Sequence, residues 1–363
     1  MSMRTGDGPV RLMIECLDAM GKCRCPLVVD ESSGALAAAL RATGAEPHLW
    51  TREASAAAAS DPLPWPTGDG FDAAFIRLPK TKDGLAFALH AAASKTEPGG
   101  AMAVFGANDE GIRSAAQRLA DVADAVETGG TGHHSRVLIG RRRNTIEGLK
   151  ERLEDWRHDG EIMLGGSSRA WVSYPGTFAK GGLDAGTAFL IEHLPKMAKG
   201  ARILDFAAGT GVIAAALANA CPDIEIDMIE ADALALAAAG ENVPNARCLS
   251  GTSLAAASGR VYDLIVSNPP IHEGTSESHR VLERLIAEAP AHLRPDGKLL
   301  LVVQRRVAVL PLMLKSFPTA RVIADNGRFT VVWAERGGRG RQMPLSSTGR
   351  VPRLSGSQAT PAP

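Results

Sequence analysis

The chain has 363 residues, of which 45% are hydrophobic, so it is long and apolar enough for two sizeable cores. Its 40 basic and 40 acidic residues balance, which excludes a global basic field and leaves only local patches for binding a nucleic acid. The five cysteines form no CxxC pair, and no signal peptide or membrane-length apolar run is recognisable, so we expect a cytoplasmic protein with reduced thiols, no metal site and no membrane contact.

The first half of the chain carries short apolar runs that predict buried strands. Three such runs are CPLVVD, AAFIRLP and AMAVFG. The first is followed by a glycine-containing turn and an alanine-rich stretch that predicts a helix. Strands that alternate with helices indicate an α/β domain, which we assign to residues 1–140.

A strongly charged stretch, GRRRNTIEGLKERLEDWRHDGE, joins the two halves. We assign residues 141–165 to this linker and predict a helix within it. Its first residues, Arg141, Arg142 and Arg143, either hold phosphates or form a solvated face of the linker. The linker therefore marks the boundary between two domains and offers one of the few local basic patches.

The second half alternates apolar runs with alanine- and leucine-rich helical stretches. The runs are RILDF, IEIDMI, DLIVS, KLLLVV and FTVVWA. This alternation predicts a mostly parallel, doubly wound α/β sheet over residues 166–336. The remaining residues, 337–363, are rich in Gly, Pro and Ser and carry only basic charges, which predicts a disordered tail that either contacts RNA or only adds solubility.

The two halves look like copies of one unit. LVVDESSGALAAAL parallels ILDFAAGTGVIAAAL with a one-residue gap, each giving a strand, an Asp, a turn and a helix, and FDAAFIRLP parallels YDLIVSNPP without a gap. Chance similarity between two α/β halves is the alternative. The first copy has Ser32 where the second has Gly209, and Arg77 where the second has Asn268. It would therefore be a scaffold or a substrate-binding platform.

The segment LDFAAGTG lies between a predicted strand and a predicted helix. Gly209 and Gly211 let the backbone turn sharply and approach a ligand, and the helix N-terminus favours a carboxylate or phosphate. Glu230, about 20 residues further on, is placed to accept hydrogen bonds from ribose hydroxyls. The pattern Gly209-x-Gly211-x-x-Ala214 fits a dinucleotide, fits S-adenosylmethionine equally well, and is also compatible with a purely structural turn.

The segment DLIVSNPPIHEG ends a buried strand on Asn268, Pro269 and Pro270. Prolines end strands because they lack the N–H that a sheet requires. In a doubly wound sheet this strand ends beside the first, so its tip faces the reactive end of a cofactor at the glycine loop. The Asn268 side-chain oxygen and backbone carbonyls held rigid by the prolines can accept both protons of an amine. Such positioning directs the amine lone pair at a methyl donor without a strong base.

The segments YPGTFAKGGLDAGTAFL, ILDFAAGTG, VSNPPIHEG and NGRFTVVW together resemble the class I methyltransferases with an Asn-Pro-Pro motif. Among these, the chain is most similar to the ribosomal RNA small-subunit methyltransferase C type, and LPKTKDGLAFAL and GANDEGIRSA resemble the N-terminal half of that group. The resemblance covers residues 70–120 and 170–335 approximately. It implies two tandem Rossmann-like methyltransferase domains, of which the N-terminal copy is degenerate and the C-terminal copy is catalytic.

The resemblance also implies an activity and a set of site residues. The enzyme would transfer a methyl group from S-adenosylmethionine to guanine N2 in 16S ribosomal RNA, with the target base flipped into the pocket. The catalytic residues would be Asn268, Pro269, Pro270 and His272. The cofactor-binding residues would be Phe178, Asp184, Asp205, Ala207, Gly209, Gly211, Glu230, Thr252 and Asn268.

Two positions depart from the family pattern. Ala207 stands where the family usually has Gly, which a less strained turn would tolerate. Ile271 stands where the family usually has an aromatic ring that stacks on the substrate base, and losing that stack would forfeit about 1–3 kcal/mol. The second departure leaves the substrate, rather than the cofactor, open.

Several alternatives remain on sequence alone. The same fold could methylate another acceptor, namely a 23S rRNA guanine, adenine N6 or a glutamine amide of a protein. A non-catalytic RNA-binding assembly factor is a second alternative, which the intact Gly209, Glu230 and Asn268 disfavour, and a dehydrogenase is a third, which leaves the Asn-Pro-Pro turn unexplained. The expected partner is ribosomal RNA or the small ribosomal subunit, gripped by the N-terminal copy and the basic patches, and we expect a monomer.

Overall fold

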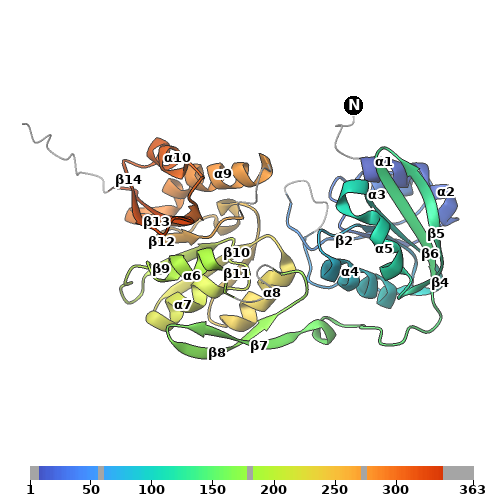
Figure 1. Cartoon of the computed structure of the whole chain (residues 1–363), viewed down its shortest axis with the longest axis horizontal. Helices are drawn as coiled ribbons and strands as arrows, with labels where there is room; N and C mark the ends of the chain where they lie inside the picture. The colour runs from blue at the N-terminus through green and yellow to red at the C-terminus, as the bar shows by residue number, and fades with distance from the viewer. Residues whose placement is uncertain (1–7, 56–60, 178–182, 271–275, 338–363) are drawn as a thin grey trace, which may run out of the picture.

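The computed structural model describes residues 8–55, 61–177, 183–270 and 276–337. Within these residues the chain forms two α/β bodies, which Figure 1 shows side by side, each built around its own mixed sheet. A hairpin of β7 (His158–Leu164) and β8 (Ser167–Ser173) follows the first body and packs Ile162, Leu164 and Trp171 into the core of the second. The predicted fold class of two tandem Rossmann-like domains is confirmed.

The first sheet has the strand order β2-β1-β3-β4-β6-β5. Its strands are β1 (Pro26–Val29), β2 (His48–Trp50), β3 (Phe71–Arg77), β4 (Thr96–Ala107), β5 (Ala123–Gly132) and β6 (Ser135–Arg142). Its helices are α1 (Gly8–Glu15), α2 (Leu17–Met20), α3 (Ala35–Ala42), α4 (Lys82–Lys95), the 3-10 helix η1 (Asn108–Glu110) and α5 (Ile112–Leu119). The inner strands β1 and β3 are almost continuously apolar because helices cover both faces of a parallel sheet.

The second sheet has the order β11-β10-β9-β12-β13-β15-β14. Its strands are β9 (Arg202–Phe206), β10 (Glu225–Glu230), β11 (Arg247–Ser250), β12 (Tyr262–Ser267), β13 (Leu293–Gln304), β14 (Thr319–Asp325) and β15 (Phe329–Glu335). Its helices are α6 (Ala185–Ile191), α7 (Val212–Ala220), α8 (Ala233–Asn242), the 3-10 helix η4 (Leu254–Ala257), α9 (Ser276–His292) and α10 (Val309–Ser316). Each apolar run singled out in the sequence forms a strand here.

The two sheets repeat one plan. The order β2-β1-β3-β4-β6-β5 corresponds to β10-β9-β12-β13-β15-β14, with the pairs β4–β6 and β13–β15 both antiparallel. Asp72 at the start of β3 accepts a hydrogen bond from the N–H of Cys25 at 3.1 Å, and Asp263 at the start of β12 accepts one from the N–H of Arg202 at 2.8 Å. The prediction that the halves repeat one unit is confirmed in strand order and register.

The strand registers correct one detail of the sequence alignment. When the two sheets are matched through the pairing of the first and third strands, Asp205 corresponds to Val28. Asp30, which the sequence comparison treated as the partner of Asp205, corresponds instead to Ala207. Both of these residues have left-handed backbone angles, with φ of +54° and +56°. The two copies therefore share a backbone turn at this point but do not share a carboxylate.

The predicted helix in the linker is wrong. Between β6 and β8 the described chain forms only the 3-10 helix η2 (Leu153–Trp156) and the strand β7 (His158–Leu164), which pairs with β8 (Ser167–Ser173). Leu149, Leu153 and Trp156 have α-helical spacing, but they pack against the core of the first body from a loop and the short 3-10 helix η2. Tertiary packing thus overrides the local periodicity.

Two further expectations concern membrane contact and the C-terminal tail. Within the residues that the structure describes, no helix is both long and apolar enough to cross a membrane. Except for Gly337, the predicted tail of residues 337–363 lies outside the described residues.

Candidate functional site

The glycine loop lies where β9 ends and α7 begins, at the carboxyl edge of the second sheet. Gly209 and Gly211 have φ of +57° and +87°, values that glycine adopts without strain. A Cβ on Gly211 would approach the Met228 sulfur to 3.3 Å, whereas one on Gly209 would meet no described atom within 4 Å. Gly211 is therefore needed for packing, while the space beside Gly209 is open to a ligand.

Ala207 takes the left-handed backbone conformation that glycine adopts most readily. Its φ of +56° shows that the turn keeps the strained geometry, so the expectation of a less strained turn is wrong. An L-residue with a Cβ in this region costs about 1–2 kcal/mol. The loop therefore carries a strained residue between β9 and Gly209.

The loop is held from behind by buried polar contacts. Asn242 at the end of α8 donates to the carbonyl oxygen of Thr210 at 3.0 Å and also bonds both backbone groups of Val172 in β8. The Trp171 indole N–H donates to the hydroxyl of Thr210 at 3.3 Å. These contacts fix the loop to the β7–β8 hairpin and so preorganise it for a ligand.

Asp205 is fully buried at the end of β9. One carboxyl oxygen accepts a hydrogen bond from the N–H of Ala214 at 3.0 Å, and the other has no hydrogen-bond partner among the described residues. Burial raises the pKa of Asp205 to about 8, and the charge of Glu230 adds to the effect. A buried oxygen without a partner is costly, so a ligand that forms a hydrogen bond with this oxygen would be stabilised.

Glu230 ends β10, the strand next to β9, and connects the glycine loop to the turn that follows β10. Its carboxylate accepts hydrogen bonds from the N–H of Gly209 at 2.8 Å, of Ala231 at 2.8 Å and of Asp232 at 3.0 Å. Burial raises its pKa, and the N–H groups of Asp232 and Gly209 oppose that rise. The carboxylate is thus fixed beside the loop and close to the space at Gly209.

Asn268 follows β12, which lies on the other side of β9. Its side-chain NH₂ donates to Asp184 Oδ2 at 3.1 Å and to the hydroxyl of Thr187 at 2.9 Å. Asp184 is itself held as the N-cap of α6 by the N–H groups of Gly186 and Thr187. Because both amide hydrogens are directed at these two oxygens, the orientation of the amide group is fixed. The side-chain oxygen of Asn268 therefore stays available to accept a hydrogen bond from a ligand.

The backbone around Asn268 is also fixed. The preceding Ser267 is fully buried and donates from its hydroxyl to the carbonyl oxygen of Phe206 at 2.6 Å, which joins the tips of β12 and β9. Pro269 is buried and Pro270 is exposed. The tip of β12 therefore presents a rigid acceptor next to the strand that carries the glycine loop.

This arrangement has known relatives. The profile of the methyltransferase small domain matches residues 169–333, and that of the N-terminal methyltransferase small domain matches residues 26–158. A ribosomal RNA small subunit methyltransferase C of Shewanella loihica is 31% identical over 270 residues, which is 73% of this chain and 78% of its own length. The chain belongs to the ribosomal RNA small subunit methyltransferase C family.

Other members of the family give the same result. The ribosomal RNA small subunit methyltransferase C of Pseudomonas entomophila is 31% identical over 275 residues, covering 74% of this chain and 80% of its own. The solved structure of the T. thermophilus 16S rRNA N2 methyltransferase RsmC, in complex with AdoMet and guanosine, covers 91% of this chain and 92% of its own with a TM-score of 0.78. At 20% identity this likeness shows the fold. The family membership and the enzyme class expected from the sequence are confirmed.

The structure brings together most of the residues predicted for a site of this methyltransferase family. Asp184, Asp205, Gly209, Glu230 and Asn268 all lie at the tips of β9, β10 and β12 or at the start of α6. Phe178, Ile271 and His272, three residues predicted for the site, lie outside the described residues. The roles assigned to these side chains stay predictions.

Thr252 follows β11 and lines a cavity of about 770 Å³ between the two halves. Arg52 and Arg77 line this cavity from the first half, and Asp232 and Arg280 line it from the second. Neither Gly209 nor Asn268 lines it, so the cavity lies to one side of the methyl-transfer machinery expected in this family. The described residues contain no group of three or more side chains suited to hold a metal ion.

Sequence reasoning missed two residues that shape the site. Thr187, in the first turn of α6, is buried and receives one of the Asn268 amide hydrogens. Asn242 is buried at the far end of α8 and holds the glycine loop. The only signal for either residue is a polar side chain on an otherwise apolar helix face, which is a weak signal without tertiary context.

Proposed function

We propose that this methyltransferase transfers the methyl group of S-adenosylmethionine to the N2 amine of a guanine in 16S ribosomal RNA. The single observation that carries the proposal is the orientation of Asn268, whose NH₂ group is bonded to Asp184 and Thr187. An asparagine held in this way offers an oxygen, and not a hydrogen-bond donor, to its substrate. The names of its relatives and the guanosine in the T. thermophilus structure support a guanine as that substrate.

The residues around the glycine loop fit the cofactor. Open space beside Gly209 and the unpartnered oxygen of Asp205 are features that a ligand would complete. We propose that Gly209, Gly211 and Asp205 hold its amino-acid end and that Glu230 holds its ribose. When bound, the cofactor supplies an electrophilic methyl group.

The protein side of the reaction is positioning. The Asn268 oxygen, together with a backbone carbonyl of the Ser267–Pro270 segment, would accept the two hydrogens of the guanine amine and turn its lone pair toward the methyl carbon. The amine nitrogen would receive the methyl group from the cofactor, and the surplus amine proton would pass to water. Preorganised acceptors of this kind act without a strong base because they stabilise the positive charge that develops on the amine.

The remaining assignments belong to the same proposal. His272 would orient the base, Ile271 would contact its face, and Phe178, Asp184, Ala207 and Thr252 would line the cofactor pocket. The target nucleotide would be flipped out of its stack, and the N-terminal copy and the basic patches would grip the RNA.

The proposed division of the chain is 1–140, 141–165, 166–336 and 337–363, for the degenerate domain, the linker, the catalytic domain and the tail. The protein would work as a monomer in the cytoplasm on ribosomal RNA or on the small subunit.

The test is a labelled-methyl assay on RNA and subunits from cells that lack the protein, followed by separation of the modified nucleosides. The proposal predicts label in N2-methylguanosine of 16S rRNA. Label in 23S rRNA, in N6-methyladenosine or in protein glutamine would move the same chemistry to another acceptor. Cofactor binding without any transfer, or no cofactor binding at all, would contradict the enzymatic proposal.

A further inference from the structure

The two halves are joined by a short backbone contact beside the cofactor-side edge of the catalytic sheet. The N–H of Ala54 donates to the carbonyl oxygen of Ala231 at 2.8 Å, and the N–H of Ala233 donates to the carbonyl oxygen of Arg52 at 2.8 Å. These bonds form an antiparallel bridge between Glu53 and Asp232. We call residues 52–54 and 231–233 the joint.

The joint connects equivalent positions of the two copies. Trp50 at the end of β2 pairs with β1 as Ile229 in β10 pairs with β9, so the residues that follow correspond one to one. On this basis Glu53 corresponds to Asp232, and each of the two hydrogen bonds is the counterpart of the other. Such reciprocal contacts are the mark of an interface with two-fold symmetry. The joint is therefore a built contact between two strand tips.

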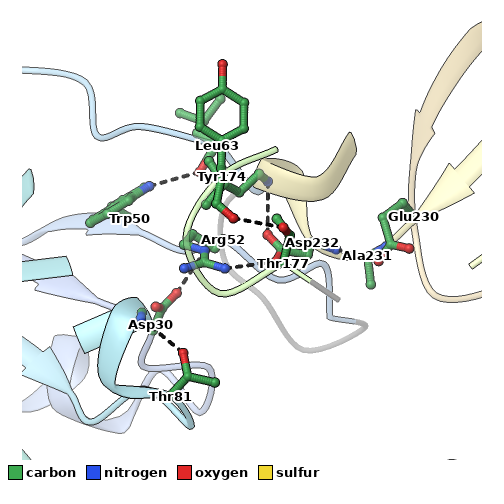
Figure 2. A network of polar contacts seen from close by, with 12 residues as sticks. Asp30, Trp50, Arg52, Leu63, Thr81, Tyr174, Thr177, Glu230, Ala231 and Asp232 are labelled. Atoms are coloured by element: carbon green, nitrogen blue, oxygen red, sulfur yellow. Dashed lines mark hydrogen bonds and ion pairs between the residues drawn. The ribbon is translucent and has the colours of Figure 1, made fainter. Parts of the chain in front are cut away.

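Side chains break this symmetry at one position. Arg52 corresponds to Ala231, so only one of the two copies contributes a guanidinium. Figure 2 shows Arg52 directed at Asp232, with Nη2 2.8 Å from Oδ2 and the side chains only 11% and 19% exposed. The guanidinium also lies 5.4 Å from the centre of the Phe87 ring. The backbone N–H of Arg52 donates a hydrogen bond to the side-chain oxygen Oδ1 of Asp30 at 2.9 Å. Arg52 is thus anchored in the N-terminal copy and extends into the catalytic one.

Electrostatics favour a firm ion pair at the joint. Burial, the largest single influence, lowers the pKa of Arg52, but the carboxylates of Asp232, Asp30 and Glu53 together raise that pKa above its ordinary value. Removing one partner of a largely buried pair leaves the other charge without compensation, which is more damaging than losing an exposed pair. Loss of Arg52 would therefore leave the Asp232 carboxylate largely buried and without its partner at the turn that follows β10.

What the joint holds is the turn that orients Glu230. The other oxygen of Asp232 caps α8 by accepting the N–H of Leu234 at 2.9 Å, and the N–H groups of Ala231 and Asp232 both bond Glu230 Oε1. In Figure 2, Glu230, Ala231 and Asp232 follow one another toward Arg52. A shift of this turn would move two of the three hydrogen bonds that set the Glu230 carboxylate.

We propose that Arg52 is a positioning residue for the cofactor, through which the degenerate N-terminal copy sets the carboxylate that binds the ribose. The inference rests on the proposed function, because the ribose role of Glu230 is part of it. Arg52 acts through Asp232 and the turn at Ala231, without touching the cofactor. The degenerate copy is then a structural component of the cofactor site in addition to any role in gripping RNA.

The test compares two arginines that contact opposite ends of α8. Arg52→Met removes the ion pair with Asp232, next to the turn that orients Glu230. Arg157→Met removes the ion pair between Arg157 Nε and Glu241 Oε2, which are 3.2 Å apart near the far end of the helix. Binding of S-adenosylmethionine to the full-length variants is measured by calorimetry, together with Tm. Arg52→Met is expected to raise the cofactor Kd about tenfold, the effect of losing one charge-assisted contact. Arg157→Met is expected to leave it within about twofold of wild type, since Glu241 bonds Arg157 and Tyr174 and, among the described residues, bonds neither the glycine loop nor the turn at Glu230.

Each outcome bears on the inference. With saturating cofactor, Arg52→Met should retain kcat while the KM for the cofactor rises. A wild-type Kd in Arg52→Met with a lowered Tm would overturn the positioning role and leave a purely structural one, and equal increases in Kd for both variants would overturn its location at this joint. If Arg52→Met does not fold, Arg52→Gln replaces it under the same criteria. Absence of binding in the wild type would reject the proposed function instead.

Discussion

The two copies of the fold differ most at the tips of three strands. The catalytic copy has Gly209, Glu230 and Asn268 where the register and the sequence place Ser32, Thr51 and Arg77 in the N-terminal copy. Strand order, bulge positions and the Asp at the start of the third strand are shared nonetheless. The fold therefore depends on the buried interior of the sheet, and the chemistry depends on a few residues at its edge.

A second difference lies inside the sheets. Asp205 is buried in the catalytic copy where the N-terminal copy has Val28, and the buried Tyr262 donates to Asp227 at 2.6 Å where the N-terminal copy has Phe71 and His48. Buried polar groups are costly unless they are paired. The N-terminal copy has apolar residues at two of these positions, as expected for a domain that no longer supports a site but must still dock.

The largest effect is expected at Asn268, where the N-terminal copy has Arg77. Asn268→Ala removes the amine acceptor and should lower kcat about 10²–10³-fold, the usual cost of losing one preorganised hydrogen-bonding group at a reacting centre. Single-turnover methylation of 16S rRNA measures the effect. The cofactor Kd should change less than kcat, because the side-chain hydrogen bonds of Asn268 reach Asp184 and Thr187 at the edge of the pocket and not the glycine loop or Glu230. Equal rates for both proteins would refute the amine-acceptor role.

The next largest effect is expected at the ribose carboxylate. Glu230→Thr places the N-terminal residue type in the catalytic copy and should weaken cofactor binding about 10–100-fold, because charge-assisted hydrogen bonds are lost. Calorimetry checks the prediction, with Glu230→Gln as the isosteric control that keeps the shape and loses the charge. The reciprocal Thr51→Glu should create no second site while Ser32 and Arg77 remain. An unaltered Kd in Glu230→Thr would place the ribose elsewhere.

The buried carboxyl predicts a pH dependence without cofactor. Asp205 has an ordinary pKa of 3.8 that rises to about 8 in the folded chain, so between these values the folded state binds more protons than the unfolded state. Stability should therefore fall as pH rises from about 4 to about 8, and this contribution should vanish in Asp205→Asn. Urea unfolding of both proteins across that range measures the slopes. Parallel slopes would show that Asp205 does not titrate in this window.

The smallest effect concerns the strained turn that both copies share. Ala207→Gly should stabilise the protein by about 0.5–1 kcal/mol, because relief of the left-handed strain exceeds the added entropy of the unfolded chain. Thermal or urea unfolding checks this. A destabilised variant would mean that the Ala207 side chain contributes more by packing than its φ of +56° costs.

Much of the fold could be read from the sequence because its strongest signals are local. Apolar runs such as ILDF and LIVS are long enough to specify buried strands, and the prolines after Asn268 end a strand unambiguously. The prediction for the linker was wrong because Leu149, Leu153 and Trp156 have helical spacing, whereas their packing against the first core determines the backbone conformation. Periodicity reports which residues are buried but not always the structure in which they are buried.

The candidate site could be predicted only in part. Gly209, Glu230 and Asn268 stand out because of residue type and spacing. The hydrogen bonds of Asn268 to Asp184 and Thr187 join positions more than 80 residues apart, and the contact of Arg52 with Asp232 spans 180. No local pattern encodes such contacts. The misalignment of Asp30 with Asp205 has a similar cause, since a strand followed by an Asp looks the same in both copies until register is known.

The central claim is that one copy carries the whole cofactor site and the other only supports it. The number of S-adenosylmethionine molecules bound per full-length chain, measured by titration calorimetry, tests it most directly. The wild type should bind one molecule per chain and the double variant Gly209→Ser, Glu230→Thr none, because that variant gives the catalytic copy the residues of the N-terminal copy. Two molecules per chain, or binding that survives in the double variant, would contradict it.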